Sequence, residues 1–186
     1  GHVVHPLSEK WSDVLKPIEE EQKASAAVAL LLNPVHEQIT VLFVKRVNNP
    51  ADPWSGQMAL PGGKCELDDQ NLKDTVTRET AEETGIDLEG CQFLGVLEAV
   101  TSAPRPDMKI LPFVILCERE PAITLNEKEL EGFVWISLAD LIQNRGSIDF
   151  GFGEFPAYIV ADTVIWGLTY RIMERFFRII GFPAQR

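Results

Sequence analysis

The stretch from Gly62 to Ile86 constrains this chain more than any other part of it. It begins with a Gly-Gly pair, passes through a short acidic loop and continues as a helix-forming segment that stops at Gly85. Residues three and four positions apart share one face of a helix, and Glu79, Glu82 and Glu83 have this spacing. Like charges so placed repel one another. The sequence therefore predicts that a positive group compensates these carboxylates.

Carboxylate oxygens are ligands that suit hard divalent cations, so the three glutamates are predicted to bind Mg²⁺ or Mn²⁺. The alternative is an ordinary solvated acidic face, since runs of charge are common on exposed helices. Arg78 within the run and the Gly-Gly turn before it favour the metal site, because a solvated face requires neither.

The residues from Arg78 to Ile86 read Arg-Glu-Thr-Ala-Glu-Glu-Thr-Gly-Ile. They resemble the core of the Nudix box, which is Arg-Glu-U-x-Glu-Glu-x-Gly-U with U aliphatic. Pro61-Gly62-Gly63 and Glu66 are similar to its opening. Thr80 departs from the pattern at an aliphatic position, where its methyl group can still pack. The resemblance implies an α/β fold, the Nudix-type α/β/α sandwich with a mixed β-sheet, and metal-dependent hydrolysis of a phosphoanhydride bond.

The same resemblance assigns roles to residues of the box. Glu79, Glu82 and Glu83 would be catalytic metal ligands, and a backbone carbonyl at Gly62 or Gly63 would complete the site. Arg78 would orient a glutamate through a charge-assisted hydrogen bond. Gly63 also has a mechanical explanation, because a side chain there would block the close approach of the backbone to the metal or the helix.

A distant acidic residue often completes such a cluster or acts as general base. The segment 126–131 is acidic and precedes an expected strand, as a comparable segment does in Nudix enzymes. Glu129 is the candidate there. The alternative is that all the glutamates of this segment are solvated loop charges.

Substrate specificity must come from outside the box. The cations best placed in sequence to meet phosphates are Lys45, Arg46, Arg105 and Lys109, and for each of them the alternative is an ordinary surface charge. Trp54 lies in a proline-flanked loop, where it could stack on a base or close the loop over the core.

Three features are similar to the coenzyme A pyrophosphatase branch of the Nudix superfamily. Eight residues instead of seven separate Asp69 from Arg78, Gly56–Lys64 resembles the branch's lead-in, and Ile165–Thr169 resembles a Trp-Gly-x-Thr element. The upstream Leu42–Val47 segment keeps an arginine but lacks the branch's two hydroxyls. The expected substrate is coenzyme A or an acyl derivative, cleaved to phosphopantetheine and 3′,5′-ADP. ADP-ribose, dinucleotides, nucleoside triphosphates and a non-catalytic regulatory module stay open as alternatives.

The net charge of −11 argues against binding to nucleic acid or anionic membranes, which need a basic surface. No apolar run of about 18 residues and no signal-peptide pattern is visible, so a cytoplasmic location is expected. The three cysteines lack paired spacing and are predicted to be reduced thiols. The chain is expected to act on a small nucleotide as a monomer or a homodimer.

The length of 186 residues indicates one domain, residues 1–186, with an N-terminal extension over 1–22. The extension is predicted to hold a short helix broken near Pro17. Hydrophobic periodicity and turn residues predict the remaining elements. These are strands at 23–32, 38–46, 58–60, 91–100, 109–118 and 133–136, a hairpin turn at Asn33-Pro34, and helices at 137–143 and 161–181. The Gly- and Phe-rich segment 146–155 is left unassigned.

Overall fold

The computed structural model describes residues 10–18, 23–52 and 54–183. Its elements in chain order are β1 (Ala26–Val35), β2 (Gln38–Arg46), β3 (Met58–Ala59), β4 (Gly62–Lys64), α2 (Leu72–Thr84), the 3₁₀ helix η1 (Leu88–Gly90), β5 (Gln92–Val96), β6 (Val100–Thr101), β7 (Lys109–Leu116), β8 (Leu130–Ser137), α3 (Leu138–Gln143), β9 (Arg145–Asp149), β10 (Glu154–Val160), β11 (Thr163–Trp166) and α4 (Leu168–Ile180).

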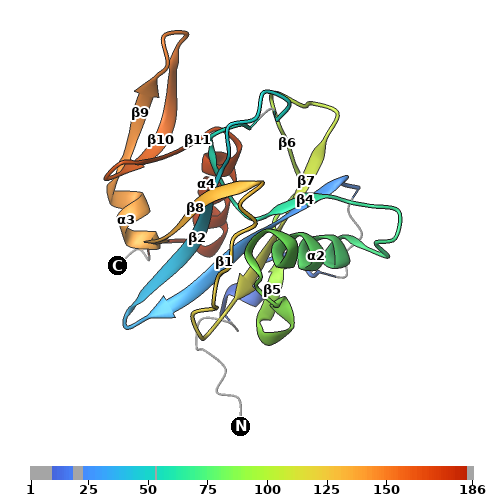
Figure 1. Ribbon diagram of the computed structural model, residues 1–186. Coiled ribbons are helices and arrows are strands. Elements are labelled where there is room, and N and C mark those ends of the chain that lie inside the picture. Colours follow the sequence, from blue (N-terminus) through green and yellow to red (C-terminus); the bar gives the residue numbers. More distant parts are fainter. Residues whose placement is uncertain (1–9, 19–22, 53, 184–186) are drawn as a thin grey trace.

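Within the described residues, β1 to β8 form one mixed sheet (Figure 1). Its main order is β3-β2-β1-β7-β5; β4 pairs with β1, β6 with β7 and β8 with β2. The pairing of β1 with β7 is parallel, and the other pairings are antiparallel. The predicted mixed sheet is therefore present. The strand predicted over 91–100 is divided into β5 and β6, which pair separately with β7, and the other predicted strands also pair within the sheet.

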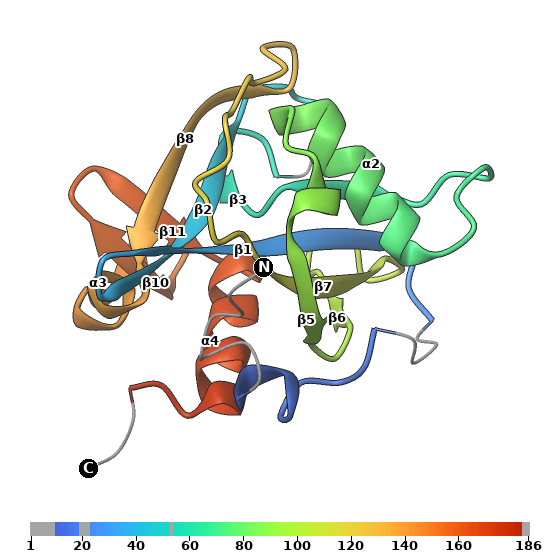
Figure 2. The same ribbon diagram turned by 90° about the horizontal axis from the view of Figure 1, so that it is seen from below.

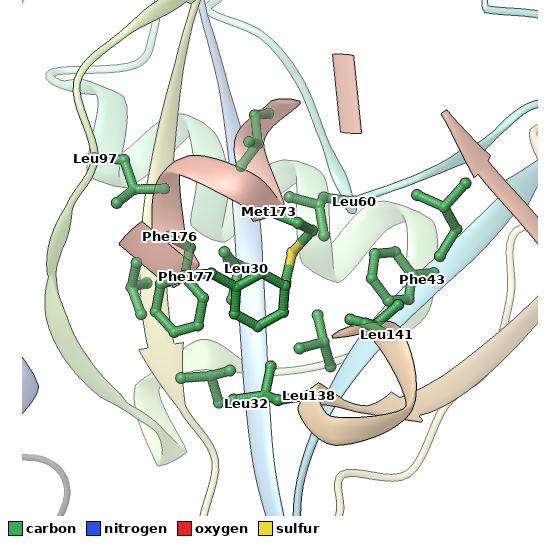
Figure 3. Packing of buried hydrophobic residues seen from close by; sticks show 14 of the residues in the cluster. Leu30, Leu32, Phe43, Leu60, Leu97, Leu138, Leu141, Met173, Phe176 and Phe177 are labelled. Atoms are coloured by element: carbon green, nitrogen blue, oxygen red, sulfur yellow. The ribbon is translucent and has the colours of Figure 1, made fainter. Parts of the chain in front are cut away.

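The central strands are apolar on both faces, as expected for a sheet covered on both sides. Leu30 of β1 and Phe43 of β2 belong to the core beneath α4, whereas Leu31 and Leu42 belong to the core beneath α2. Figure 2 shows α2 and α4 on opposite faces of β1. In Figure 3, side chains of α4 such as Phe176 point into the cluster formed by the strands. The predicted α/β/α sandwich is thus confirmed.

The β1–β2 hairpin forms, but its turn lies later than predicted. Asn33 and Pro34 continue β1, pairing with Thr40 and Ile39, and the chain reverses at His36, which has a φ of +56°. Proline is tolerated because β7 has already ended beside Leu32, so no strand on that side requires the missing N–H. The Asn33 side-chain amide instead donates to the carbonyl of Cys117, at 2.8 Å.

The prediction of one helix over 161–181 is wrong in its first part. Residues Thr163–Trp166 form β11, which pairs with β10, and β10 pairs with β9 in a second, three-stranded sheet. Gly167, with a φ of +68°, separates β11 from α4. The apolar spacing that indicated a helix does hold from Leu168 onward. The segment 146–155, left unassigned from sequence, supplies β9, the start of β10 and the turn between them.

The second sheet projects from one end of the molecule (Figure 1). Strand alternation and register place Tyr158 and Ile165 on the face that is buried against the body of the protein. Phe155 and Trp166 lie on the other face, where they contact Phe150 at centroid distances of 6.1 and 4.5 Å. The aromatic cluster is therefore half-exposed.

Much of the N-terminal extension lies outside the described residues, namely positions 1–9 and 19–22. Of the predicted helix, residues 10–12 are helical, and Trp11 and Leu15 are buried in the core beneath α4. Lys16 forms an isolated β-bridge with Val96. No helix in the described ranges is both long and apolar enough to cross a membrane.

The prediction that all three cysteines are reduced is wrong for two of them. Cys91 and Cys117 form a disulfide, with 4.6 Å between their Cα atoms. They directly flank Gln92 and Leu116, which face each other where β5 pairs with β7. The pairing depends on this strand register, and a separation of 26 residues along the chain gives no sign of it.

Candidate functional site

Gly62 and Gly63, predicted as a turn, form the start of strand β4, which runs between β1 and α2 with no room for side chains. The name Gly-Gly turn is kept below for residues 62–63. At Gly62 a Cβ atom would lie 2.2 Å from the carbonyl oxygen of Ala27, and at Gly63 it would lie 2.5 Å from the Cδ atom of Glu79. Such separations are shorter than any ordinary contact, so only glycine allows the backbone this close to β1 at position 62 and to α2 at position 63. The turn therefore places the peptide groups of 62–63 directly beside the glutamate face of the helix.

Helix α2 has well-defined ends. Asn71 caps its N-terminus by accepting a hydrogen bond from the Asp74 amide at 2.8 Å, and Gly85 ends it with a φ of +73°. Val76, Thr80 and Glu83 are among its buried residues. A carboxylate thus lies on the same buried side of the helix as the groups that dock it onto the sheet.

Arg78 is held by several acceptors at once. Its guanidinium donates to both oxygens of Asp69, at 3.0 and 2.8 Å, to Glu79 Oε1 at 2.8 Å and to the carbonyl of Lys64 at 3.1 Å. The Arg78 guanidinium holds the pKa of Asp69 well below its usual range. Two-point pairing with one carboxylate fixes the plane of the guanidinium, so the Glu79 carboxylate has a fixed donor beside it.

Glu83 is the buried carboxylate of the site. Its side chain lies beneath the Gly-Gly turn, and its Oε1 accepts a hydrogen bond from the Gly62 amide at 3.2 Å. Its Oε2 is buried and has no hydrogen-bond partner among the described residues. Burial raises the pKa of Glu83 to about 8, despite the Gly62 hydrogen bond and the positive charge of Arg46. The desolvation of this oxygen is therefore not compensated by a hydrogen bond from the described residues.

Only two of the three box glutamates line the cleft. Glu79 and Glu83 both line the cleft described below, and burial raises the pKa of Glu79 as well. Glu82 is 57% exposed and lies 3.5 Å from Arg78, outside the cleft lining. In the part of the chain that the structure describes, no three His, Cys, Asp or Glu side chains gather into a ready metal cluster. The expected third ligand is thus on the helix but turned away.

A cleft of about 420 Å³ opens beside the Gly-Gly turn. Glu79, Glu83 and the two glycines lie on one side, and the 48–57 loop, the end of β2 and the loop before β7 supply much of the rest. Of the residues predicted from sequence, the cleft brings together seven: Arg46, Trp54, Gly63, Glu79, Glu83, Arg105 and Glu129. Arg78 and Glu82 lie next to it, and Lys109 does not line it.

The end of β2 explains how Arg46 reaches the cleft. The pairing of β2 with β8 shifts register between Lys45 and Arg46, and such an irregularity redirects the following side chain. Lys45 is exposed and pairs with Glu131 at 3.1 Å. Arg46 lines the cleft instead and pairs with Asp52 at 2.6 Å.

Lys109, predicted to bind phosphate, does not line the cleft. It is the first residue of β7 and is exposed, whereas its neighbours Met108 and Ile110 both line the cleft. Side chains alternate between the two faces of a strand, so Lys109 is directed away from the cleft that its neighbours line.

Sequence reasoning missed two charged residues that line the cleft. Lys64 follows the Gly-Gly pair directly, so its position in the motif could have identified it. Asp52 stands in an Asp-Pro-Trp run that was interpreted only as a turn signal. Its contact with Arg46 depends on how the loop folds back, which the sequence alone does not give.

Comparisons with known proteins identify the family of the chain. Residues 22–155 match the NUDIX domain. The chain is 30% identical to the mouse mitochondrial coenzyme A diphosphatase NUDT8 over 169 residues, which is 85% of this chain and 79% of the relative. It is 30% identical over 145 residues to the Caenorhabditis elegans peroxisomal coenzyme A diphosphatase ndx-8, covering 77% of this chain and 61% of the relative.

The chain is also similar to a further relative and to two solved structures. An uncharacterized Schizosaccharomyces pombe protein is 38% identical over 126 residues, which is 62% of this chain but 38% of that protein. A MutT/nudix family protein from Enterococcus faecalis has a TM-score of 0.56 at 20% identity, covering 97% of this chain and 76% of that one.

A C. elegans Ap4A hydrolase has a TM-score of 0.52 at 18% identity, covering 65% of this chain and 85% of that one. At such identities the two solved structures show the shared fold alone. The domain match covers well over half of the chain and includes the Gly-Gly turn and α2. This chain belongs to the Nudix family.

Proposed function

We propose that this protein hydrolyses a phosphoanhydride bond, with Mg²⁺ or Mn²⁺ as cofactor and coenzyme A or acyl-coenzyme A as substrate. The observation that carries the proposal is the composition of the cleft. Carboxylates at the Gly-Gly turn suit a divalent cation, and Arg46 and Arg105 in the same cleft suit phosphate groups. A metal-bridged diphosphate requires both kinds of group in one place.

The residues present fit a hard divalent cation. Glu83 Oε2 is buried without a partner among the described residues, and a bound cation would supply the missing positive charge. Glu79 lies beside the backbone of Gly63, so carboxylate and carbonyl oxygens are available together. Glu79, Glu83 and the Gly62–Gly63 backbone would hold the cation, and Glu82 would join them after leaving Arg78.

Once bound, the cation would neutralise phosphate charge and lower the pKa of a water molecule. The chain's own residues supply orientation. Arg78, fixed by Asp69, holds the Glu79 carboxylate in place. Arg46 and Arg105 would bind the diphosphate from the opposite side. Glu129 lines the cleft and is exposed, and it would accept a proton from the attacking water.

Two lines support coenzyme A as the substrate. The lengthened box and the lead-in from Gly56 to Lys64 are similar to the coenzyme A pyrophosphatase branch, and two relatives near 30% identity carry that activity in their names. Water would add to one phosphorus of the diphosphate and the bridging P–O bond would break. The products would be phosphopantetheine and 3′,5′-ADP, or the acyl form of the former.

A substrate panel tests this function. Purified protein with Mg²⁺ or Mn²⁺ is incubated with coenzyme A, acyl-coenzyme A, ADP-ribose, NADH, diadenosine polyphosphates and nucleoside triphosphates, and products are identified by mass spectrometry. Release of phosphopantetheine and 3′,5′-ADP is the expected result. Cleavage of ADP-ribose with inert coenzyme A would overturn the substrate and keep the hydrolase. No turnover despite metal binding would favour a regulatory module.

The remaining expectations concern partners and location. The acidic composition supports a small nucleotide in preference to nucleic acid as the ligand. Monomer and homodimer are distinguished by light scattering of the purified chain. The two coenzyme A diphosphatases are named for mitochondria and peroxisomes, so imaging of the tagged full-length protein would test the cytoplasmic location proposed here.

A further inference from the structure

Among its described residues, the 48–57 loop is connected to the body of the protein by a backbone hydrogen bond to β2, by the packing of Trp54 on the core and by the side chain of Asp52. Its backbone is internally bonded, with Asp52 donating to the Asn49 carbonyl at 2.9 Å and Gln57 donating to the Trp54 carbonyl at 3.1 Å. The loop meets β2 where the Arg46 amide donates to the Gln57 carbonyl at 3.0 Å. The first two bonds, together with the Ser55 amide donating to the Asp52 carbonyl at 3.1 Å, lie within the loop, so the third is the backbone bond that joins it to β2.

Asp52 supplies the side-chain connection. Its Oδ2 accepts from Arg46 Nε at 2.6 Å, and its Oδ1 accepts from the backbone amide of Trp54 at 3.0 Å. The Asp52 side chain is 13% exposed and that of Arg46 is 30% exposed, so solvent screens this pair less than it screens a surface pair. One carboxylate therefore fixes a guanidinium and a tryptophan at the same time.

The arrangement leaves Arg46 suited to a phosphate. A guanidinium carries five N–H donors, and Asp52 engages the one on Nε. The four donors on the two Nη atoms form a fork that matches phosphate oxygens. Arg46 also lies close enough to Glu83 for its charge to act on that carboxylate, which puts it between the loop and the predicted metal ligands.

We propose that Asp52 is a positioning residue that holds Arg46 and Trp54 as one unit, with Arg46 aimed at the diphosphate of the substrate and Trp54 beside it. The inference rests on the proposed function, because it assigns this side of the same cleft to the nucleotide. Asp52 itself contacts no reacting atom. Its effect is exerted through the orientation of Arg46 and the placement of the tryptophan.

The test is Asp52→Asn in the full chain, read by KM and kcat and by calorimetric binding of ADP with Mg²⁺. The amide can still accept from Trp54 but presents no second carboxylate oxygen to Arg46. ADP affinity should fall about 10-fold and KM should rise by a similar factor, with kcat within about twofold. Asp52→Glu, which restores the charge, should recover part of the affinity.

Asp107→Asn is the matched control. Asp107 also pairs with a cleft arginine, Arg105, but at 3.5 Å and with its own side chain 76% exposed. A pair that solvent screens so strongly contributes little, so ADP affinity should change less than about twofold.

A double-mutant cycle decides between positioning and general loop damage. In the Arg46→Ala background, Asp52→Asn should have little further effect on ADP affinity, because its partner is gone. Additive losses, or an unchanged KM in Asp52→Asn, would overturn the proposal. The ADP measurement needs no turnover. If no substrate is hydrolysed but the cycle shows coupling, the proposed function fails while the role of Asp52 stands.

Discussion

The two sides of the cleft are built differently. On the carboxylate side, formed by the Gly-Gly turn and α2, several constraints act together: glycines that admit no Cβ, a capped helix, and an arginine with four short hydrogen bonds. On the nucleotide side, formed by the end of β2, the 48–57 loop and the Arg105 loop, the carboxylate of Asp52 connects Arg46 of β2 to Trp54 of the loop.

This difference separates two tasks that the cleft must perform. Metal-assisted chemistry depends on ligand positions to within a fraction of an ångström, and rigid elements provide that. Recognition of the rest of a substrate can be carried by loops, which vary without disturbing the scaffold. Changes on the carboxylate side should therefore act on turnover and metal binding, whereas changes on the nucleotide side should act on KM.

The largest effect is expected for Glu83→Gln. The substitution keeps the shape of the side chain and the Gly62 contact but removes the charge that a cation would require. We expect kcat to fall by about 10³-fold or more at saturating Mg²⁺, with similar losses for Glu79→Gln and Glu82→Gln. Glu127→Gln, an exposed change outside the cleft lining, is the control. Near-normal turnover in a box variant would remove that residue from the metal site.

In the metal-free protein, the buried charge of Glu83 should lower the stability of the folded state. Because burial raises the pKa of Glu83 to about 8, the folded state binds this proton more tightly than the unfolded state does. The associated stability is present below a pH of about 4.5 and is lost as the pH rises through about 8. Glu83→Gln should therefore unfold at a higher temperature than wild type at pH 8.5.

Added metal should reverse the order of the melting temperatures of wild type and Glu83→Gln. Mg²⁺ or Mn²⁺ is expected to raise the melting temperature of wild type, as mass action requires for a ligand of the folded state, and to leave Glu83→Gln nearly unchanged. Equal shifts in the two proteins would place the cation elsewhere.

On the nucleotide side, Arg105 and Lys109 form a matched pair. Arg105 lines the cleft, and Lys109 is on the strand that follows but is directed away from it. Arg105→Ala should raise KM about 5- to 10-fold with kcat nearly constant, because a charged hydrogen bond to phosphate is lost. Lys109→Ala should leave both constants unchanged. A KM effect at Lys109 would mean that the substrate extends beyond this cleft.

Substitution of Trp166 by alanine tests whether the substrate site extends onto the second sheet. It is half-buried on β11 against Phe150 and Phe155, just before the part of α4 that lines the cleft. Truncating a fully buried tryptophan costs about 3–5 kcal/mol, and at this exposure we expect about 1–3 kcal/mol in urea unfolding. KM should not change. A raised KM with intact stability would extend the substrate site onto the second sheet.

The features that could be predicted from the sequence are those formed by residues close together along the chain. The Gly-Gly turn, the three glutamates and the end of α2 at Gly85 are local, so one 25-residue pattern contains them. The strands of the main sheet were recognisable because both faces are buried and their apolar runs are long.

Features that depend on distant pairing were not predictable in the same way. The register shift that sends Arg46 and not Lys45 into the cleft arises from β8, and the contact of Asp52 with Arg46 arises from the path of a loop. The β-branched run Thr163–Ile165 did carry a strand signal. The apolar spacing of the helix that follows obscured it, because Ile165 is in phase with the buried face of α4.

The disulfide between Cys91 and Cys117 has a practical consequence for spectroscopy. It leaves Cys65 as the single free thiol among the three cysteines of the chain, and that side chain is exposed. Cys65 lies two residues after Gly63, and its amide is anchored to the carbonyl of Ser25 at 2.8 Å. A thiol-reactive fluorophore would therefore label one position without mutagenesis. Its emission would give an optical titration of the Gly-Gly turn as divalent cations are added.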